Sequence, residues 1–164
     1  MKKLNKFQFI SLVISILIVA FIFTNSACPA EESGDMSGGL LGFINGVIAF
    51  FGIDWRMPHN LLRKIAHFVE FFGLGVSFLV TTVAFTKKIV LHLTKPLFFS
   101  MAVAVIDEMI QSFFPGRSSQ VSDVLLDFFG AFCGVMTALL VVYIINKRGG
   151  RYVIQKHNCT KGNI

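Results

Sequence analysis

The chain has 164 residues, of which 54% are hydrophobic, 15% are charged and 19 are phenylalanine. A soluble domain of this length cannot bury so much apolar surface, so the composition excludes an ordinary water-soluble protein and indicates a membrane protein. The net charge of +6 does not indicate nucleic-acid binding, because the basic residues form no patch interleaved with aromatic residues.

Four apolar stretches are each long enough to cross a bilayer as a helix, which takes about 20 residues. They cover residues 7–23, 62–85, 96–114 and 123–145, with an outer loop at 24–60. The runs are continuous and do not alternate with period two, so a β-barrel is not expected. Because lipid leaves few options for backbone polar groups, the sequence predicts one all-helical polytopic bundle over residues 1–164, with about four transmembrane helices.

The first stretch has two interpretations. Residues 1–28, MKKLNKFQFISLVISILIVAFIFTNSAC, are similar to a secretory or lipoprotein signal that ends at Cys28. The apolar core is long for such a signal, and Asn25 fits poorly three residues before a lipidated cysteine. We therefore predict a retained first helix, and a signal cleaved after residue 27 is the alternative.

Basic residues indicate the orientation of the bundle. They precede the first span, lie between the second and third spans and follow the fourth: Lys2, Lys3, Lys6, Lys87, Lys88, Lys95, Lys147, Arg148, Arg151, Lys156 and Lys161. The loop after the first span opens with Glu31, Glu32 and Asp35 instead. The positive-inside rule therefore predicts that both termini face the cytoplasm.

The predicted outer loop contains the apolar stretch LLGFINGVIAFFGIDW, residues 40–55. This stretch is too short to span a bilayer comfortably. We expect it to lie in the outer membrane interface, with Trp55 at the depth of the headgroups. A re-entrant segment, or one that packs into the core, is the alternative.

Polar side chains occur at one depth on three of the predicted helices. On the second span, Lys64, His67 and Glu70 are spaced three residues apart and so share one helix face. The outer halves of the third and fourth spans add Asp107, Glu108, Gln111, Asp123 and Asp127. Ionisable residues at this depth usually face the bundle interior or a water-filled cavity. The pattern predicts an outward-facing polar cavity that binds a ligand.

The alternative is that these residues only fix helix packing, for example through an ion pair between His67 and Glu108. Chance would not place them all at one level, so the cavity is favoured.

The segment FPGRSSQVSD joins the third and fourth spans through a Pro-Gly turn. Ser119 or Ser122 is predicted to cap the fourth helix. Arg117 precedes that helix N-terminus, and its guanidinium suits a phosphate. The simpler interpretation is that Arg117 neutralises Asp123 or Asp127.

Four glycines are predicted to allow close helix packing. Gly130 and Gly134 form a small-residue face on the fourth span, expected to pack against another helix of the same chain. Gly73 and Gly75 are expected to act in the same way on the second span.

The segments KIAHFVEFFGLG and DEMIQSFFPGRSSQVSDVLLDFFGAFCG resemble the VanZ-like membrane proteins, a family named for a teicoplanin-resistance protein. The polar stretch NSACPAEES is similar to the first outer loop of that family, and the resemblance covers most of residues 24–143. Phe71 stands where many members have tyrosine. The resemblance singles out Lys64, His67, Glu70, Asp107, Glu108, Gln111, Pro115, Gly116, Arg117, Asp123, Asp127 and Gly130.

This resemblance implies a four- or five-helix protein of the bacterial cytoplasmic (inner) membrane. Some members of the family lower susceptibility to teicoplanin-type glycopeptides. The expected partners are membrane lipids, including a lipid-linked cell-wall precursor, and no nucleic acid.

Two function classes stay open. In the first, the protein is not an enzyme and binds the headgroup of an envelope lipid. In the second, a membrane-embedded enzyme acts on such a lipid, with His67 or Glu108 as acid and base and with carboxylates that hold a divalent ion. The first is favoured because the chain has no nucleophile elbow and no HExxH metal motif. We therefore expect neither a cofactor nor a metal.

Overall fold

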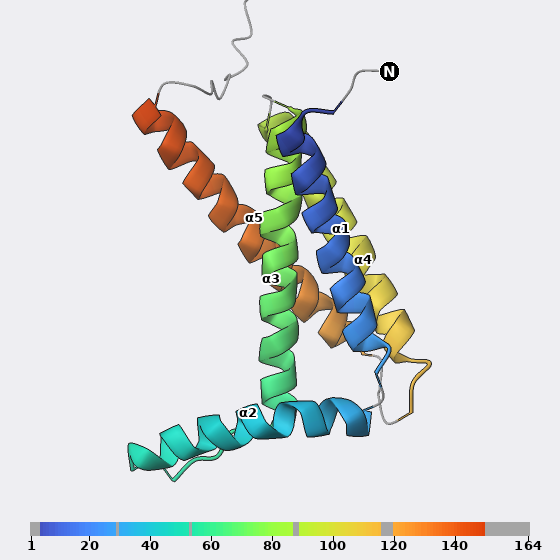
Figure 1. Ribbon diagram of the computed structural model, residues 1–164, viewed down its shortest axis with the longest axis vertical. Helices are drawn as coiled ribbons and strands as arrows, with labels where there is room; N and C mark the ends of the chain where they lie inside the picture. Colours follow the sequence, from blue (N-terminus) through green and yellow to red (C-terminus); the bar gives the residue numbers. More distant parts are fainter. Residues whose placement is uncertain (1–3, 29, 53, 87–88, 116–119, 150–164) are drawn as a thin grey trace, which may run out of the picture.

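The computed structural model describes residues 4–28, 30–52, 54–86, 89–115 and 120–149. Within these ranges the chain forms α1 (Lys6–Ser26), α2 (Ala30–Phe50), α3 (His59–Phe85), the short 3₁₀ helix η1 (Val90–His92), α4 (Thr94–Gln111) and α5 (Val121–Gly149). Helices α1, α3 and α4 run side by side, α5 crosses them at a steep tilt, and α2 lies across one end (Figure 1). The described part of the chain contains no strand, so the predicted all-helical fold is confirmed.

Three of the described helices are long and apolar enough to cross a membrane: Lys6–Ser26, His59–Phe85 and Val121–Lys147. The remaining predicted span corresponds to α4, whose 18 residues include the charged residues Lys95, Asp107 and Glu108. Both acids are buried between helices, and the side chains of Phe98 and Phe99 are exposed on the outside of the bundle. The arrangement is compatible with about four membrane helices, with the polar side of α4 turned inward.

The predicted ends of the third and fourth spans are displaced by a few residues. The third span was expected to reach residue 114, but α4 ends at Gln111. The fourth was expected over 123–145, but α5 extends from Val121 to Gly149. The apolar run of the third span continues through Phe113 and Phe114, past the end of α4. Helix α5, by contrast, continues through polar residues beyond its apolar run.

Helix α1 is held in the bundle at both of its ends. Its first turn is closed by a capping box, in which Asn5 and Gln8 exchange backbone-to-side-chain hydrogen bonds of 2.8 and 3.1 Å. The Gln8 side chain also donates to the carbonyl of Ala84 in α3, at 3.1 Å. Near the other end, Ile22 and Ser26 are fully buried. Retention of this first helix in the mature protein stays a prediction.

Helices α3 and α5 cross at points where only glycine fits. A Cβ atom placed on Gly134 would lie 2.1 Å from the carbonyl oxygen of Phe72, and one on Gly75 would lie 2.0 Å from that of Ala131. A Cβ on Gly130 would similarly meet the backbone of Phe68, at 2.6 Å. The predicted intrachain packing role of these glycines is confirmed. The prediction of close packing is wrong for Gly73, because a Cβ atom there would have no other atom within 4 Å.

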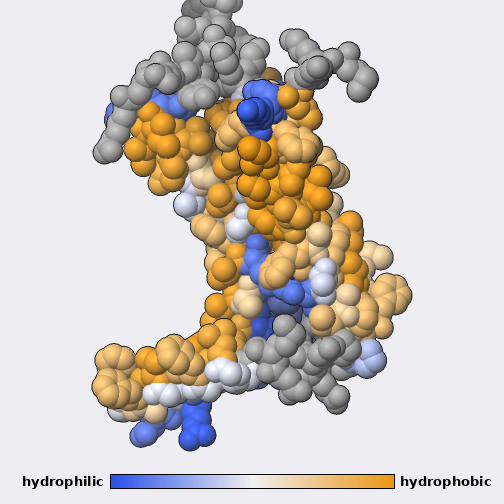
Figure 2. Space-filling model, in the orientation of Figure 1, coloured by the Kyte–Doolittle hydropathy of each residue, from blue (hydrophilic) through white to orange (hydrophobic). Residues whose placement is uncertain are grey.

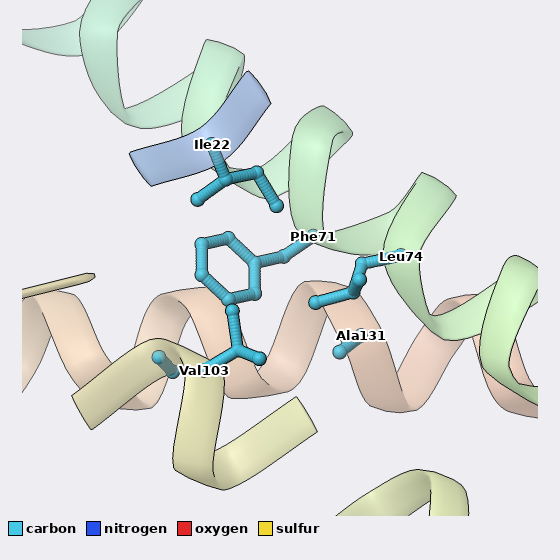
Figure 3. Packing of buried hydrophobic residues seen from close by; sticks show 6 residues of the cluster. Ile22, Phe71, Leu74, Val103 and Ala131 are labelled. Atoms are coloured by element: carbon cyan, nitrogen blue, oxygen red, sulfur yellow. The ribbon is translucent and has the colours of Figure 1, made fainter. Parts of the chain in front are cut away.

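An apolar core fills the space between the four packed helices. The buried side chain of Phe71 in α3 points toward Ile22 of α1 and Val103 of α4 (Figure 3). Leu74 and Ala131 complete the contact between α3 and α5. This core positions the four helices relative to one another.

The predicted outer loop at 24–60 is helical over much of its length, because Ala30–Phe50 forms α2. The glycines and serines of its first half are poor helix formers, which is why the sequence did not indicate a helix there. Helix α2 extends sideways beyond the bundle (Figure 1), and Phe43 and Phe50 are 70% and 86% exposed. The alternative of a core-packing segment is therefore wrong. The orientation fits a helix that lies in the membrane interface.

Candidate functional site

Four helices bring polar side chains together near the end of the bundle that α2 crosses. Figure 2 shows hydrophilic surface there, enclosed by hydrophobic surface. We call the buried and half-buried polar residues at this place the polar cluster: Asn25, Ser26, His67, Glu70, Asp107, Glu108, Gln111 and Asp127. Each helix contributes through the part that packs against the apolar core, so the helix crossings position the cluster.

Asp107 of α4 lies at the centre of the polar cluster and is fully buried. Its Oδ1 atom accepts a hydrogen bond of 2.5 Å from the hydroxyl of Ser26 in α1. Its Oδ2 atom accepts a hydrogen bond of 2.9 Å from the amide of Gln111, one turn further along α4. Donors from two helices thus fix the position of this carboxylate.

His67 of α3 lies between two buried carboxylates. Its Nδ1 atom is 3.8 Å from Oδ2 of Asp107 and 4.0 Å from Oδ1 of Asp127. Asp127 is 1% exposed, and its Oδ2 atom has no hydrogen-bond partner among the described residues. One ligand atom from each of His67, Asp107 and Asp127 lies within 4.8 Å of the others. The three residues come from three different helices.

Two further acids accept hydrogen bonds from other segments of the bundle. Glu108 is 3% exposed, and its Oε2 atom accepts a hydrogen bond of 3.2 Å from the backbone N–H of Gln120, just before α5. Glu70 accepts a hydrogen bond of 2.9 Å from the amide of Asn25 in α1. These bonds connect the start of α5 and the end of α1 to the cluster.

Two basic residues and one acid lie where the polar cluster opens to the surface. We call these three residues, Arg63, Lys64 and Asp123, the mouth of the cluster. The Lys64 ammonium is 3.1 Å from Asp123 Oδ1, and the Arg63 guanidinium is 4.0 Å from Asp123 Oδ2. A small pocket of about 10 Å³ lies between the mouth and the cluster. This volume holds about one water molecule or one ion.

Several predicted site residues lie outside the described part of the chain. Arg117 and Gly116 are among them, and so is Ser119, one of the two predicted helix caps. The prediction that Ser122 caps the helix is wrong, because Ser122 is the second residue of α5, after Val121. Asp123 is in the first turn of α5, as predicted. Pro115 is exposed and Gly130 is buried at the helix crossing.

Two members of the polar cluster, Asn25 and Ser26, were not predicted from the sequence. Both lie at the end of α1 and bond to Glu70 and Asp107. A signal was present, since these two polar residues directly follow the first apolar run and so lie at the depth of the predicted cavity. They were assigned to the outer loop because hydropathy alone sets the end of a span too early.

The sequence model of the VanZ/LLP1 family matches residues 9–143. The chain belongs to the VanZ/LLP1 family. The match confirms the resemblance to VanZ-like proteins and includes every member of the polar cluster and its mouth. No curated protein and no solved structure matches the chain.

In this VanZ/LLP1 protein the described acids of the cluster and mouth outnumber the basic groups. The acids are Glu70, Asp107, Glu108, Asp123 and Asp127. The basic groups are Arg63, Lys64 and His67. Such a group can exchange protons through an imidazole flanked by carboxylates, hold a cation, or bind a polar headgroup at its mouth.

Proposed function

We propose that this protein binds the phosphate-bearing headgroup of an envelope lipid at the outer face of the bacterial cytoplasmic membrane. The observation that carries the proposal is the basic pair at the mouth of a buried polar cluster. The side chains of Lys64 and Arg63 are 43% and 26% exposed, so a headgroup can reach them. A lipid-linked cell-wall precursor is a ligand of this class, and its capture would lower susceptibility to teicoplanin-type glycopeptides.

The headgroup phosphate would bind at the mouth and not deeper. The pocket behind the mouth holds a group of about the size of one water molecule, which is smaller than a phosphate. The carboxylates behind it would also repel an anion. At the mouth, Lys64 and Arg63 would exchange Asp123 for the phosphate, and the planar guanidinium can bind two phosphate oxygens at once.

Arg117 would add a third basic group to this site. It lies three residues before Gln120 in the sequence, and the backbone of Gln120 bonds to Glu108 of the polar cluster. The expectation that Arg117 binds phosphate therefore remains part of the proposal.

The test is lipid binding by the purified protein, measured by native mass spectrometry. The wild type should retain phosphatidylglycerol and undecaprenyl phosphate, and it should retain little diacylglycerol, which lacks phosphate. Loss of both basic groups in the double variant Arg63→Ala and Lys64→Ala should weaken retention of the phosphate lipids about tenfold or more, which is roughly 1.4 kcal/mol.

The matched control is Lys147→Ala, which removes an exposed lysine near the far end of α5 and should bind like the wild type. Cells that produce the wild type should also be less susceptible to teicoplanin than cells that produce the double variant. Equal retention of diacylglycerol, or undiminished binding by the double variant, would contradict the proposal.

A second candidate function is an enzyme that acts on the same class of lipid. It is favoured by the position of His67 within 4.0 Å of two buried aspartates, an arrangement suited to proton transfer. The mass spectra of the binding experiment separate the two functions, because turnover changes the mass of the lipid and binding does not.

A further inference from the structure

We infer that His67, Asp107 and Asp127 form a binding site for one divalent transition-metal ion of the Zn²⁺ or Mn²⁺ type. The three side chains come from α3, α4 and α5 and converge inside the bundle. One nitrogen and two carboxylate oxygens form the ligand set. From the sequence, a divalent ion was considered only within the alternative enzyme function, because these residues are 40 and 20 positions apart and match no metal-binding motif.

The spacing of the three ligand atoms fits an ion between them. Metal–ligand bonds of about 2.0–2.2 Å place two ligands of a tetrahedral ion roughly 3.4 Å apart. The distances from His67 Nδ1 are 3.8 Å to Asp107 and 4.0 Å to Asp127, which exceed the length of an N–H···O hydrogen bond. The two distances from His67 would need to shorten by roughly half an ångström around an ion, and all three ligand atoms lie within 4.8 Å of one another.

The side chain of Asp127 supplies an independent observation. It is 98% buried, and its Oδ2 atom has no hydrogen-bond partner among the described residues. A carboxylate oxygen left in this state inside a membrane bundle is costly. Asp127 also lines the pocket of about 10 Å³ beside His67, which has room for one ion or water molecule. A cation bound by both carboxylate oxygens of Asp127 would also provide Oδ2 with its missing partner.

The surroundings of Asp107 are suited to a metal ligand. Ser26 and Gln111 both donate hydrogen bonds to its carboxylate, at 2.5 and 2.9 Å. Donors of this kind orient a ligating carboxylate and hold it in place before the metal arrives.

The ligand types select the class of metal. An imidazole combined with carboxylates suits Zn²⁺, Mn²⁺ or Fe²⁺, whereas Ca²⁺ and Mg²⁺ prefer oxygen ligands alone. Water would complete the coordination, because three protein ligands leave at least one position open. The ion would connect three helices and stabilise the folded bundle.

The test uses the full-length protein in detergent, stripped with a chelator and dialysed, and it needs no lipid. Added Zn²⁺ or Mn²⁺ should bind at about one ion per chain by elemental analysis. It should also raise the melting temperature of the wild type, and Mg²⁺ at the same concentration should not. Asp127→Asn and His67→Gln should each lose the bound ion and the rise in melting temperature.

The matched control is Asp54→Asn, which makes the same chemical change at an exposed residue between α2 and α3 and should bind the ion like the wild type. The wild type alone can overturn the inference, by showing neither bound ion nor a change in melting temperature. Equal binding by the wild type and Asp127→Asn would also overturn it, because the ion would then lie elsewhere. Because the assay contains no lipid, its failure leaves the proposed headgroup site standing.

Discussion

The carboxylate of Asp107 is fully buried and depends on donors from two helices. Ser26 of α1 and Gln111 of α4 bond to its two oxygens. Each donor offsets part of the cost of keeping an acid out of water. The polar cluster is therefore sensitive to the loss of a single hydroxyl, even one that no ligand touches.

Ser26→Ala tests this dependence in metal-free protein. The change leaves Oδ1 of Asp107 without its hydroxyl donor, so the free energy of unfolding should fall by about 1–3 kcal/mol. Unfolding in mixed micelles measures the difference. The matched control is Thr24→Ala, whose exposed hydroxyl bonds to its own helix at Ala20 and should cost less than about 0.5 kcal/mol. Equal effects in the two variants would contradict the assigned role of Ser26.

At the scale of helices, the crossing of α3 and α5 fixes how His67 and Asp127 face each other. Gly134 and Gly75 each lie directly against the backbone of the opposite helix. Any side chain at these positions would separate the two helices and draw the ligands of the cluster apart. Close packing of this kind, and not hydrophobic burial, drives association of helices within lipid.

Gly134→Ala should therefore destabilise the protein. The added Cβ would lie 2.1 Å from the Phe72 carbonyl oxygen, and relief of this overlap should cost about 1–3 kcal/mol. Gly73→Ala is the matched control, because nothing lies within 4 Å of its added Cβ. Alanine also favours the helix, so the control should gain roughly 0.5–1 kcal/mol. If the two variants shifted the melting temperature in the same direction relative to the wild type, the result would contradict this packing.

The helices differ in how well they could be predicted. Hydropathy located α1, α3 and α5 to within a few residues, because each contains a long continuous apolar run. It placed α4 as a span but set its end at residue 114, because Phe113 and Phe114 continue the apolar run past Gln111. It missed α2, because glycine and serine mask the helix in its first half.

The candidate site could be predicted only in part. Spacing along a helix indicated that Lys64, His67 and Glu70 share a face, and depth indicated that the acids of α4 and α5 lie at the same level. Which atoms meet depends on how the helices cross. The position of Lys64 beside Asp123 depends on the glycine contacts between α3 and α5, and that of His67 beside Asp107 depends on how α3 packs against α4. No spacing rule along the sequence predicts either pair.

At the scale of the whole molecule, the polar cluster lies toward one end of the bundle, where Figure 2 shows hydrophilic surface between hydrophobic surfaces. The end that α2 crosses carries the cluster, and the first residues of α1 and the last residues of α5 lie at the opposite end (Figure 1). Helix α1 begins with Lys6 and α5 carries Lys147 near its end, so the positive-inside rule predicts that the cluster faces outward. The proposed capture of an outer-leaflet headgroup depends on this orientation.

Cysteine labelling in intact cells tests the outward orientation most directly. Cys28 lies two residues after Ser26, which bonds to Asp107, so its accessibility reports the side of the membrane on which the cluster opens. Two variants with single cysteines are needed, one that keeps Cys28 and one that keeps Cys159. A small impermeant methanethiosulfonate reagent should modify Cys28 in intact cells and Cys159 only after the membrane is permeabilised. Modification of Cys159 in intact cells, with Cys28 protected until permeabilisation, would contradict the outward-facing site.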